Sequence, residues 1–369
     1  MTGVSGTASA CDVCLRRSWL VARLIGHIDL AWSAKRGRAG LLALTDVALI
    51  AALAGAERAR VETEYAHFDA HAARQRCAAA GVVALCRCDE RYPAALEDLP
   101  DPPAVLYVYG EITRFLRVAA GDRVAIVGAR RATPYGLEQA RALGRGMAAA
   151  GLTVVSGMAL GVDAAAHAGA LEVEGATLAI LAGGPERPYP ATKRQLHERI
   201  AATAAVVAEM PPGTRARRWC FPARNRIIAA LARATVIVEA SERSGSLITA
   251  SLAADLGRDV AAVPGLVTSP LAAGTNALIV DGARLVRGPQ DVLELLFGAA
   301  AVALAPAPAR DALEPDLRAL LDRVRAGCDT VAALAANGGA VDALLAGLAQ
   351  LELRGRVRRG PGGRYVATS

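Results

Sequence analysis

The spacing of hydrophobic residues changes character about eighty residues into the chain. Up to Ala80, apolar side chains recur at intervals of three and four, which is typical of helices that bury one face. The runs with this spacing cover residues 15–28, 46–53 and 65–80. The pattern predicts a small helical module over residues 1–80, and the polar segment 1–10 is expected to be disordered.

From Val82 onward, short continuous apolar runs alternate with helical patterns as far as Phe297. Runs that lack polar alternation predict strands buried on both faces. Strands and helices that alternate at this spacing along the chain indicate a parallel, doubly wound sheet over residues 81–297. The predicted strands are 82–85, 124–127, 153–155, 177–181, 206–209, 236–239 and 260–263, with one more after the turn at Asp101. Helices are expected to start near residues 135, 162, 192, 225 and 247.

The C-terminal part has a different composition. Residues 298–312 are rich in alanine and proline, which indicates a stiffened linker. Helical patterns at 315–325, 330–336 and 341–353 precede an Arg-rich segment with a Pro-Gly-Gly turn. Three helices followed by a two-stranded wing predict a winged-helix domain over residues 313–369.

Composition narrows the class of protein. The 369 residues are 53% hydrophobic, so a sizeable core is expected, and the net charge of +7 favours a polyanionic partner. Arginine far outnumbers lysine and alanine is abundant, as in proteins from GC-rich genomes, so only clusters of arginine count. No stretch predicts a membrane span or a secretion signal. Seven scattered cysteines do not suggest a disulfide framework, and cytoplasm is the expected compartment.

The densest cluster of arginines lies in residues 213–230, before a helix expected to start at Ile227. Guanidinium groups match phosphate oxygens, and aromatic faces among them can stack unpaired bases. A basic surface loop without a ligand is the alternative. The cluster holds Arg215, Arg217, Arg218, Trp219, Phe221, Arg224 and Arg226.

The loops after the predicted strands are small and rich in glycine and serine. Ligands bind at the carboxyl ends of strands in an open parallel sheet. Glycine lets the backbone approach a ligand, and N–H groups at helix starts bind anions. The sequence therefore predicts an anion-lined sheet edge. It has neither a Gly-x-Gly-x-x-Gly dinucleotide motif nor a P-loop, so neither dinucleotide binding nor ATP hydrolysis is supported.

Two further side-chain patterns have competing interpretations. Asp163 and His167 are four residues apart and could act as acid and base; we favour a helix cap and a packed histidine instead. Cys220 lies among arginines, which can lower a thiol pKa; we favour a packing role here too.

Four cysteines are candidate metal ligands. Cys11 and Cys14 form one pair, and Cys86 and Cys88 form another. Four thiolates can hold a structural zinc ion. Because the separation of the pairs fits no standard zinc module, ordinary unliganded cysteines are the favoured alternative.

Six motifs occur together in order: residues 127–136, 156–167, 221–229, 238–250, 262–265 and 274–279. In these motifs the chain resembles the DNA-processing protein A family, also called DprA or Smf, over roughly residues 90–297. The resemblance implies an extended Rossmann-like fold that binds single-stranded DNA, forms a homodimer and loads the RecA recombinase onto incoming DNA during natural transformation. The residues that the motifs assign to the DNA site are Gly128, Arg130, Ser156, Gly157, Gly161, Phe221, Arg224, Asn225, Arg226, Ser244, Gly245 and Ser246.

Three departures from the family pattern stand out. The loop at 182–190 has Ala-Gly-Gly where many members have Gly-x-Gly-x-Asp, Ala129 replaces a frequent serine, and the N-terminal module matches only loosely.

The leading hypothesis is a single-strand-binding mediator that protects incoming DNA, with neither catalysis nor a cofactor. A nucleotide-binding or nucleotide-hydrolysing enzyme that uses Asp163, Glu209 or Glu239 is the main rival. A duplex-binding regulator is a third reading, but the helix at 341–353 has no arginine to meet a major groove.

Overall fold

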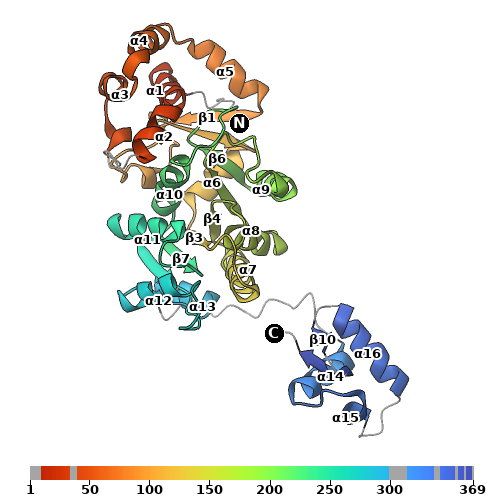
Figure 1. Ribbon diagram of the computed structural model, residues 1–369. Coiled ribbons are helices and arrows are strands. Elements are labelled where there is room, and N and C mark those ends of the chain that lie inside the picture. The colour runs from red at the N-terminus through yellow and green to blue at the C-terminus, as the bar shows by residue number, and fades with distance from the viewer. Residues whose placement is uncertain are drawn as a thin grey trace. The chain divides into compact units, whose positions relative to one another are not determined.

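The computed structural model describes residues 10–33, 40–298, 314–335, 341–353, 356–360 and 363–367. The chain divides into two compact units, residues 1–304 and 305–369 (Figure 1). The expected disorder before Cys11 and the linker predicted at 298–312 lie outside the described residues, apart from Ala10 and Gly298.

The first unit begins with a helical module. Its helices are α1 (Asp12–Arg23), α2 (Ile25–Ser33), α3 (Asp46–Leu53), α4 (Arg58–Ala66) and α5 (Ala70–Ala79). The prediction for 46–53 is confirmed, and Thr45 caps this helix by accepting the N–H of Ala48. The single helix expected over 65–80 is wrong. The chain breaks between α4 and α5, where the Asp69 carboxylate accepts the N–H of Ala72 and caps a new helix.

A nine-stranded sheet follows, in the order β1-β2-β6-β5-β4-β3-β7-β8-β9. Only the pairs β1–β2 and β2–β6 are antiparallel. This confirms the mostly parallel, doubly wound prediction. The strands are β1 (Val82–Cys86), β2 (Val105–Tyr109), β3 (Arg123–Gly128), β4 (Thr153–Ser156), β5 (Thr177–Leu181), β6 (Ala205–Ala208), β7 (Ala234–Val238), β8 (Asp259–Ala262) and β9 (Arg284–Leu285).

The order of the strands reverses at β3. The chain proceeds outward through β4, β5 and β6 on one side, then returns to place β7, β8 and β9 on the other. The crevice between the carboxyl ends of β3 and β7 is therefore the topological switch point, where open α/β sheets bind their ligands.

Helices cover both faces of the sheet (Figure 1). One core packs side chains of α7, α8 and α13 against β3, β4, β7 and β8, and the other packs α6, α10 and α11 against the opposite face. The helices are α6 (Ile112–Ala120), α7 (Pro134–Ala149), α8 (Val162–Glu172), α9 (Arg194–Thr203), α10 (Cys220–Leu231), α11 (Gly245–Asp255), α12 (Ala273–Val280) and α13 (Pro289–Phe297).

Helix α10 begins earlier than the sequence predicts. It starts at Cys220 rather than at 225–227, and Pro222 is tolerated because it lies in the first turn. Phe221, Arg224 and Arg226 are therefore helical residues with fixed directions, and do not belong to a flexible loop.

The second unit has the predicted winged-helix elements. They are α14 (Pro315–Arg325), α15 (Val331–Ala335), α16 (Val341–Leu353), β10 (Val357–Arg359) and β11 (Tyr365–Ala367). Leu320, Leu334, Leu348 and Tyr365 belong to a core of its own. Among the residues that the structure describes, no helix combines the length and the apolar character that crossing a membrane requires.

Candidate nucleic-acid interface

A pocket of about 340 Å³ opens at the switch point. Its walls come from the loop after β3, the loop and helix start after β7, and the first turns of α10; we call it the switch-point pocket. The pocket brings together most of the predicted site residues. These are Gly128, Arg130, Phe221, Arg224, Asn225, Ser244, Gly245 and Ser246.

An aromatic and cationic cluster forms one wall. The Phe221 ring lies 5.4 Å from the Tyr189 ring, centroid to centroid, and the Arg130 guanidinium lies 5.1 Å from the Phe221 centroid. Arg130 and Arg131 are exposed, and in the described part of the chain no carboxylate forms an ion pair with either. This wall offers both a stacking surface and unneutralised positive charge.

The start of α11 forms the facing wall. Ser244 caps the helix by accepting the N–H of Ser246, and the two hydroxyl oxygens lie 2.8 Å apart. The first N–H groups of a helix have no partner within it and attract anions. A side chain at Gly245 would meet nothing within 4 Å, so the helix start is open to a ligand.

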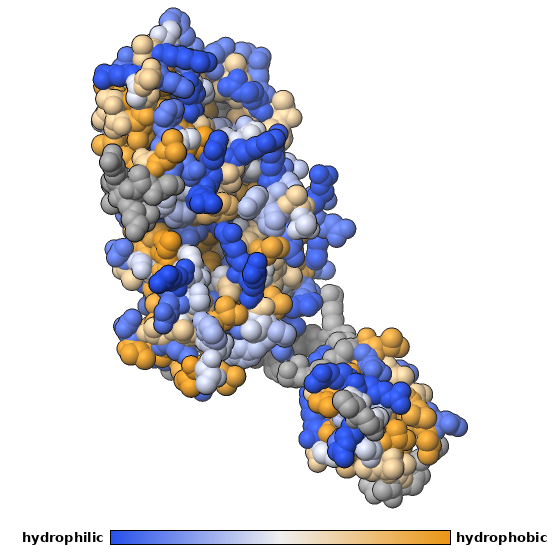
Figure 2. Space-filling model, in the orientation of Figure 1, coloured by the Kyte–Doolittle hydropathy of each residue, from blue (hydrophilic) through white to orange (hydrophobic). Residues whose placement is uncertain are grey.

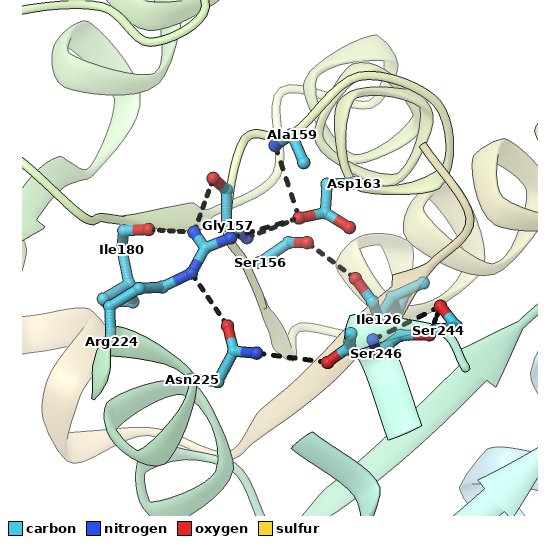
Figure 3. A network of polar contacts seen from close by, with 11 residues as sticks. Ile126, Ser156, Gly157, Ala159, Asp163, Ile180, Arg224, Asn225, Ser244 and Ser246 are labelled. Carbon is cyan, nitrogen blue, oxygen red and sulfur yellow. Dashed lines mark hydrogen bonds and ion pairs between the residues drawn. The ribbon is translucent and has the colours of Figure 1, made fainter. Parts of the chain in front are cut away.

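Arg224 lies at the base of the pocket, where its guanidinium is buried (Figure 3). Its Nη1 donates to the carbonyls of Gly157 at 2.6 Å and Ile180 at 2.5 Å. A Cβ on residue 157 would lie 1.9 Å from Nη1, so only glycine leaves room for this side chain. Burial lowers the pKa of Arg224 to about 10, which leaves it charged at neutral pH.

Arg224 also orients Asn225. Its Nε donates to the Asn225 Oδ1 at 2.9 Å, and the Asn225 Nδ2 donates to the Gly245 carbonyl at 3.3 Å. The amide is therefore fixed between α10 and the start of α11 (Figure 3).

Two carboxylates satisfy backbone donors around the pocket. Asp163 accepts the N–H groups of Gly157 and Ala159 and lies 4.0 Å from the Arg224 guanidinium. Burial raises the pKa of Asp163 above its usual range. The Glu239 carboxylate accepts hydrogen bonds from the Thr133 backbone N–H, at 2.8 Å, and from the Thr133 hydroxyl. Thr133 is the residue that caps α7.

Four predicted site residues lie outside the pocket wall: Ser156, Gly157, Gly161 and Arg226. The Ser156 hydroxyl is buried and donates to the Ile126 carbonyl between β4 and β3, so the expectation that it faces a ligand is wrong. Gly157 lies beneath Arg224. Gly161, with φ at +79°, begins α8, and a Cβ there would strike the Ala129 carbonyl.

Arg226 is also corrected. Its guanidinium donates to Glu209 at 2.7 Å and Asp101 at 3.0 Å and is buried between them. Burial alone would lower the pKa of Arg226, but the two carboxylates outweigh it and raise the pKa above its ordinary value. This side chain has no free charge for a phosphate.

Trp219 is unavailable for stacking. It is 1% exposed. Its indole Nε1 donates to the Ile25 carbonyl, and its backbone N–H donates to the Asp29 carboxylate. The residue thus fastens the start of α10 to the helical module. Of the remaining cluster, Arg215, Arg217 and Arg218 are exposed on the approach to α10 but do not line the pocket.

The packing interpretations of two other side chains are confirmed. His167 is buried and its Nδ1 lies 2.6 Å from the Thr177 hydroxyl on β5, while burial lowers its pKa to about 3. Cys220 is buried as well, and burial raises its pKa to about 12. Asp163 supports the loop before α8 instead of capping that helix at its N-cap position, which Gly161 occupies.

The four candidate metal ligands lie together, in the helical module and at β1. Their sulfur atoms are all within 4.8 Å of one another. None of them lines the switch-point pocket.

Sequence reasoning missed Tyr189, which is 51% exposed and packs beside Phe221. The Tyr-Pro at the end of the loop after β5 was the available signal. Arg131, which lines the pocket, had a signal in its position just after β3.

Taken together, the fold and this site define a class: a Rossmann-like α/β protein whose switch point carries an open helix start beside arginine and aromatic side chains, joined to a winged-helix domain. The family model described as DNA recombination-mediator protein A matches residues 83–297, and the DprA winged helix domain matches residues 304–363. The chain belongs to the DprA family.

Individual relatives agree with this assignment. The DNA processing protein DprA of Bacillus subtilis is 37% identical over 216 residues, which cover 58% of this chain and 72% of that protein. The X-ray structure of DprA from Streptococcus pneumoniae superposes with a TM-score of 0.62 at 31% identity, covering 76% of this chain and 95% of that one. DNA processing protein A from Helicobacter pylori, whose structure concerns its single-stranded DNA binding mode, has a TM-score of 0.52 at 30% identity and covers 58% and 95%.

Proposed function

We propose that this protein binds single-stranded DNA in the switch-point pocket. The observation that carries the proposal is the pairing of exposed Arg130 with the Phe221 ring, opposite the open start of α11. Stacking on an aromatic face is available to every base, and it is tolerant of sequence. Single-stranded DNA is favoured over duplex because paired bases cannot reach Phe221.

Each part of the pocket takes one part of the strand. One phosphate lies at the first N–H groups of α11, beside the Ser244 and Ser246 hydroxyls. Arg130 and Arg131 neutralise the neighbouring phosphates of the strand. A base stacks on Phe221 and Tyr189. Asn225, already oriented by Arg224, presents its amide edge to the same strand. Binding is then largely independent of sequence and weakens as salt rises.

Membership of the DprA family supports the biological role that we propose. The protein acts in the cytoplasm as a mediator without catalysis: it protects incoming DNA and loads RecA onto it during natural transformation or recombination. It works as a homodimer that associates through the Rossmann-like domain. The most exposed large apolar side chains of that domain support such a contact: Leu266, Val267 and Val280 are 77%, 92% and 86% exposed. Figure 2 shows apolar surface at the end of the first unit that carries α12.

The binding proposal is tested by fluorescence anisotropy with a labelled oligonucleotide, single-stranded or annealed. Phe221→Ala should weaken single-strand binding by about 1–3 kcal/mol, roughly 5-fold to 150-fold, because it removes one stacked base. Arg130→Ala should reduce the slope of log affinity against log salt by about 0.7, because one phosphate contact is lost.

Arg287→Ala is the matched control. It also removes one positive charge, but Arg287 is 77% exposed on its side chain and lies outside the pocket. Equal losses for Arg130→Ala and Arg287→Ala would reject the pocket as the binding site, as would equal affinity for duplex and single strand.

One observation favours the rival enzyme: Asp163 borders the pocket and has a raised pKa, which is common at catalytic sites. Its Oδ2, however, already accepts two backbone N–H groups and lies 4.0 Å from the Arg224 guanidinium. Glu209 and Glu239 are likewise engaged, with Arg226 and Thr133. We therefore expect no free base after incubation with nucleoside monophosphates, and robust turnover lost in Asp163→Asn would establish the enzyme instead.

A further inference from the structure

Four cysteine side chains from two distant segments meet at the junction of the helical module and the sheet. Cys11 is the N-cap residue of α1 and Cys14 lies in its first turn, while Cys86 ends β1 and Cys88 follows in the next turn. All four Sγ atoms lie within 4.8 Å of one another. We propose that these thiolates bind one structural zinc ion.

The distances suit a tetrahedral thiolate site. A zinc–sulfur bond of about 2.3 Å in tetrahedral geometry places neighbouring sulfurs roughly 3.8 Å apart. The Sγ atoms of Cys14 and Cys88 are 3.7 Å apart. This is far beyond the roughly 2.0 Å of a disulfide bond, and none of these cysteines is in a disulfide.

The surroundings also suit a closed metal site. Cys14 and Cys86 are buried and Cys11 is half-buried, so only Cys88 faces solvent. The Cys11 N–H points to the Cys86 sulfur at 3.5 Å, and such N–H donors stabilise thiolates bound to metal. Arg74 donates to the Ala10 carbonyl, just before Cys11, and also pairs with the Asp12 carboxylate. Four protein ligands leave no open position for a substrate, so the role is structural.

The ion would reinforce the contact between two elements that already share a small apolar core, to which Leu15 of α1 and Ala84 of β1 belong. Cys11 and Cys14 fix the start of α1, and Cys86 and Cys88 fix the end of β1. From α1 the chain continues into α2, where Ile25 and Asp29 hold Trp219 at the start of α10. Zinc therefore stabilises the module on which the start of α10 is anchored, without touching the switch-point pocket.

The first measurement is elemental analysis of the full chain purified from zinc-supplemented cells without added chelator. We expect about one zinc per chain and loss of that zinc in the double variant Cys14→Ser with Cys86→Ser. Cys77→Ser and Cys328→Ser are matched controls, because both residues are free cysteines outside the cluster, and both variants should keep their zinc.

The second measurement uses the wild-type chain, so it does not depend on the variant folding. Titration with a mercurial that blocks thiols should release zinc to a colorimetric chelator, and the thermal midpoint should fall by at least about 5 °C after release. Less than roughly a tenth of a zinc per chain, iron in its place, or the same zinc content in the double variant would overturn the proposal.

Discussion

Arg224 and Arg226 lie two residues apart in α10, and both guanidinium groups are buried, but their partners differ. Arg224 donates mainly to main-chain carbonyls and keeps its charge next to the pocket. Arg226 turns away to Glu209 and Asp101, which neutralise it. A substitution at each position should therefore have a different consequence.

Arg226→Ala is expected to destabilise the fold rather than the DNA complex. Removing the buried guanidinium leaves two partly buried carboxylates without their cation, a loss of about 3 kcal/mol, at the lower end for a broken buried pair. Chemical denaturation monitored by circular dichroism should report the loss. Single-strand affinity measured well below the unfolding midpoint should change less than threefold or so, since one charge outside the interface is worth little.

The exposed substitution Arg287→Ala should cost less than about 1 kcal/mol under the same conditions. If Arg226→Ala kept wild-type stability but lost DNA affinity, the phosphate-binding role that its sequence motif suggested would be restored.

His167 predicts a pH dependence of stability. Burial lowers its folded-state pKa to about 3, below the ordinary value of about 6.5 for an unfolded chain. Because the fold favours the neutral imidazole, the contribution of His167 to the free energy of unfolding is highest above about pH 6.5. It decreases as the pH falls from there towards about 3. At pH 5 the loss is about 2 kcal/mol.

The measurement compares wild type with His167→Asn, whose amide can still bond to the Thr177 hydroxyl. The stability difference between the two proteins should shift by about 2 kcal/mol between pH 7.5 and pH 5. The raised pKa of Asp163 acts in the opposite direction, but it is present in both proteins and cancels. A pH-independent difference would show that folding does not lower the pKa of His167.

At this scale the sequence predicted part of the site. Arg130 and Ser244 could be found because each lies near a glycine in a loop after a strand, and Phe221 because it belongs to the arginine-rich cluster. Arg226 and Trp219 could not be assigned correctly. Their partners, Asp101 and Asp29, are separated from them by 125 and 190 residues, and a sequence motif shows a charge without showing what neutralises it.

At the scale of elements, α7 and α11 begin beside the pocket and differ in what meets them. The start of α7 has the Glu239 carboxylate bonded to its capping threonine. The start of α11 has only the hydroxyls of Ser244 and Ser246. Positive dipole ends attract anions, so α11 is the open position for a phosphate.

Gly245→Asp tests this difference. A carboxylate in the first turn should stabilise α11 by about 0.3–1 kcal/mol, while weakening single-strand binding by about 1 kcal/mol, roughly fivefold. Thermal unfolding and anisotropy measure the two opposite effects on one protein.

Gly245→Ala provides the neutral comparison, because a Cβ at this position meets no atom within 4 Å. It should leave DNA affinity almost unchanged. Equal losses for alanine and aspartate would mean that bulk, and not charge, blocks the site, which would remove the role assigned to the helix start.

Strand and helix positions were the most predictable feature of the elements, because buried runs and glycine turns specify them locally. The break between α4 and α5 was one exception, and the start of α10 was another. Its first turns carry arginine, proline and asparagine, which are typical of loops, and they are helical because Trp219 and Arg226 are anchored by distant partners.

At the scale of the whole molecule, the two compact units have separate cores. The sheet order could not be read from the sequence alone. Alternating strands and helices imply parallel pairing, but nothing local shows that β2 joins β6 antiparallel and extends the sheet.

Deletion of residues 299–369 should leave most single-strand affinity intact, within about threefold. The pocket lies wholly in the first unit, and α16 has acidic residues and no arginine. Anisotropy on the truncated and full-length chains at the same salt checks this. A tenfold loss would make the winged-helix domain part of the DNA site.

The Glu239 carboxylate at the capping residue of α7 has a further consequence. In doubly wound folds that bind dinucleotides, the pyrophosphate occupies the turn after the first strand of the parallel core. Here that turn is β3 to α7, and its threonine already donates to a fixed negative charge inside the protein. A free diphosphate would meet repulsion where such cofactors normally dock. We therefore expect free nucleotide diphosphates to compete poorly for this crevice. A nucleic-acid strand, whose phosphates are separated by one nucleoside each, does not place two adjacent phosphates there.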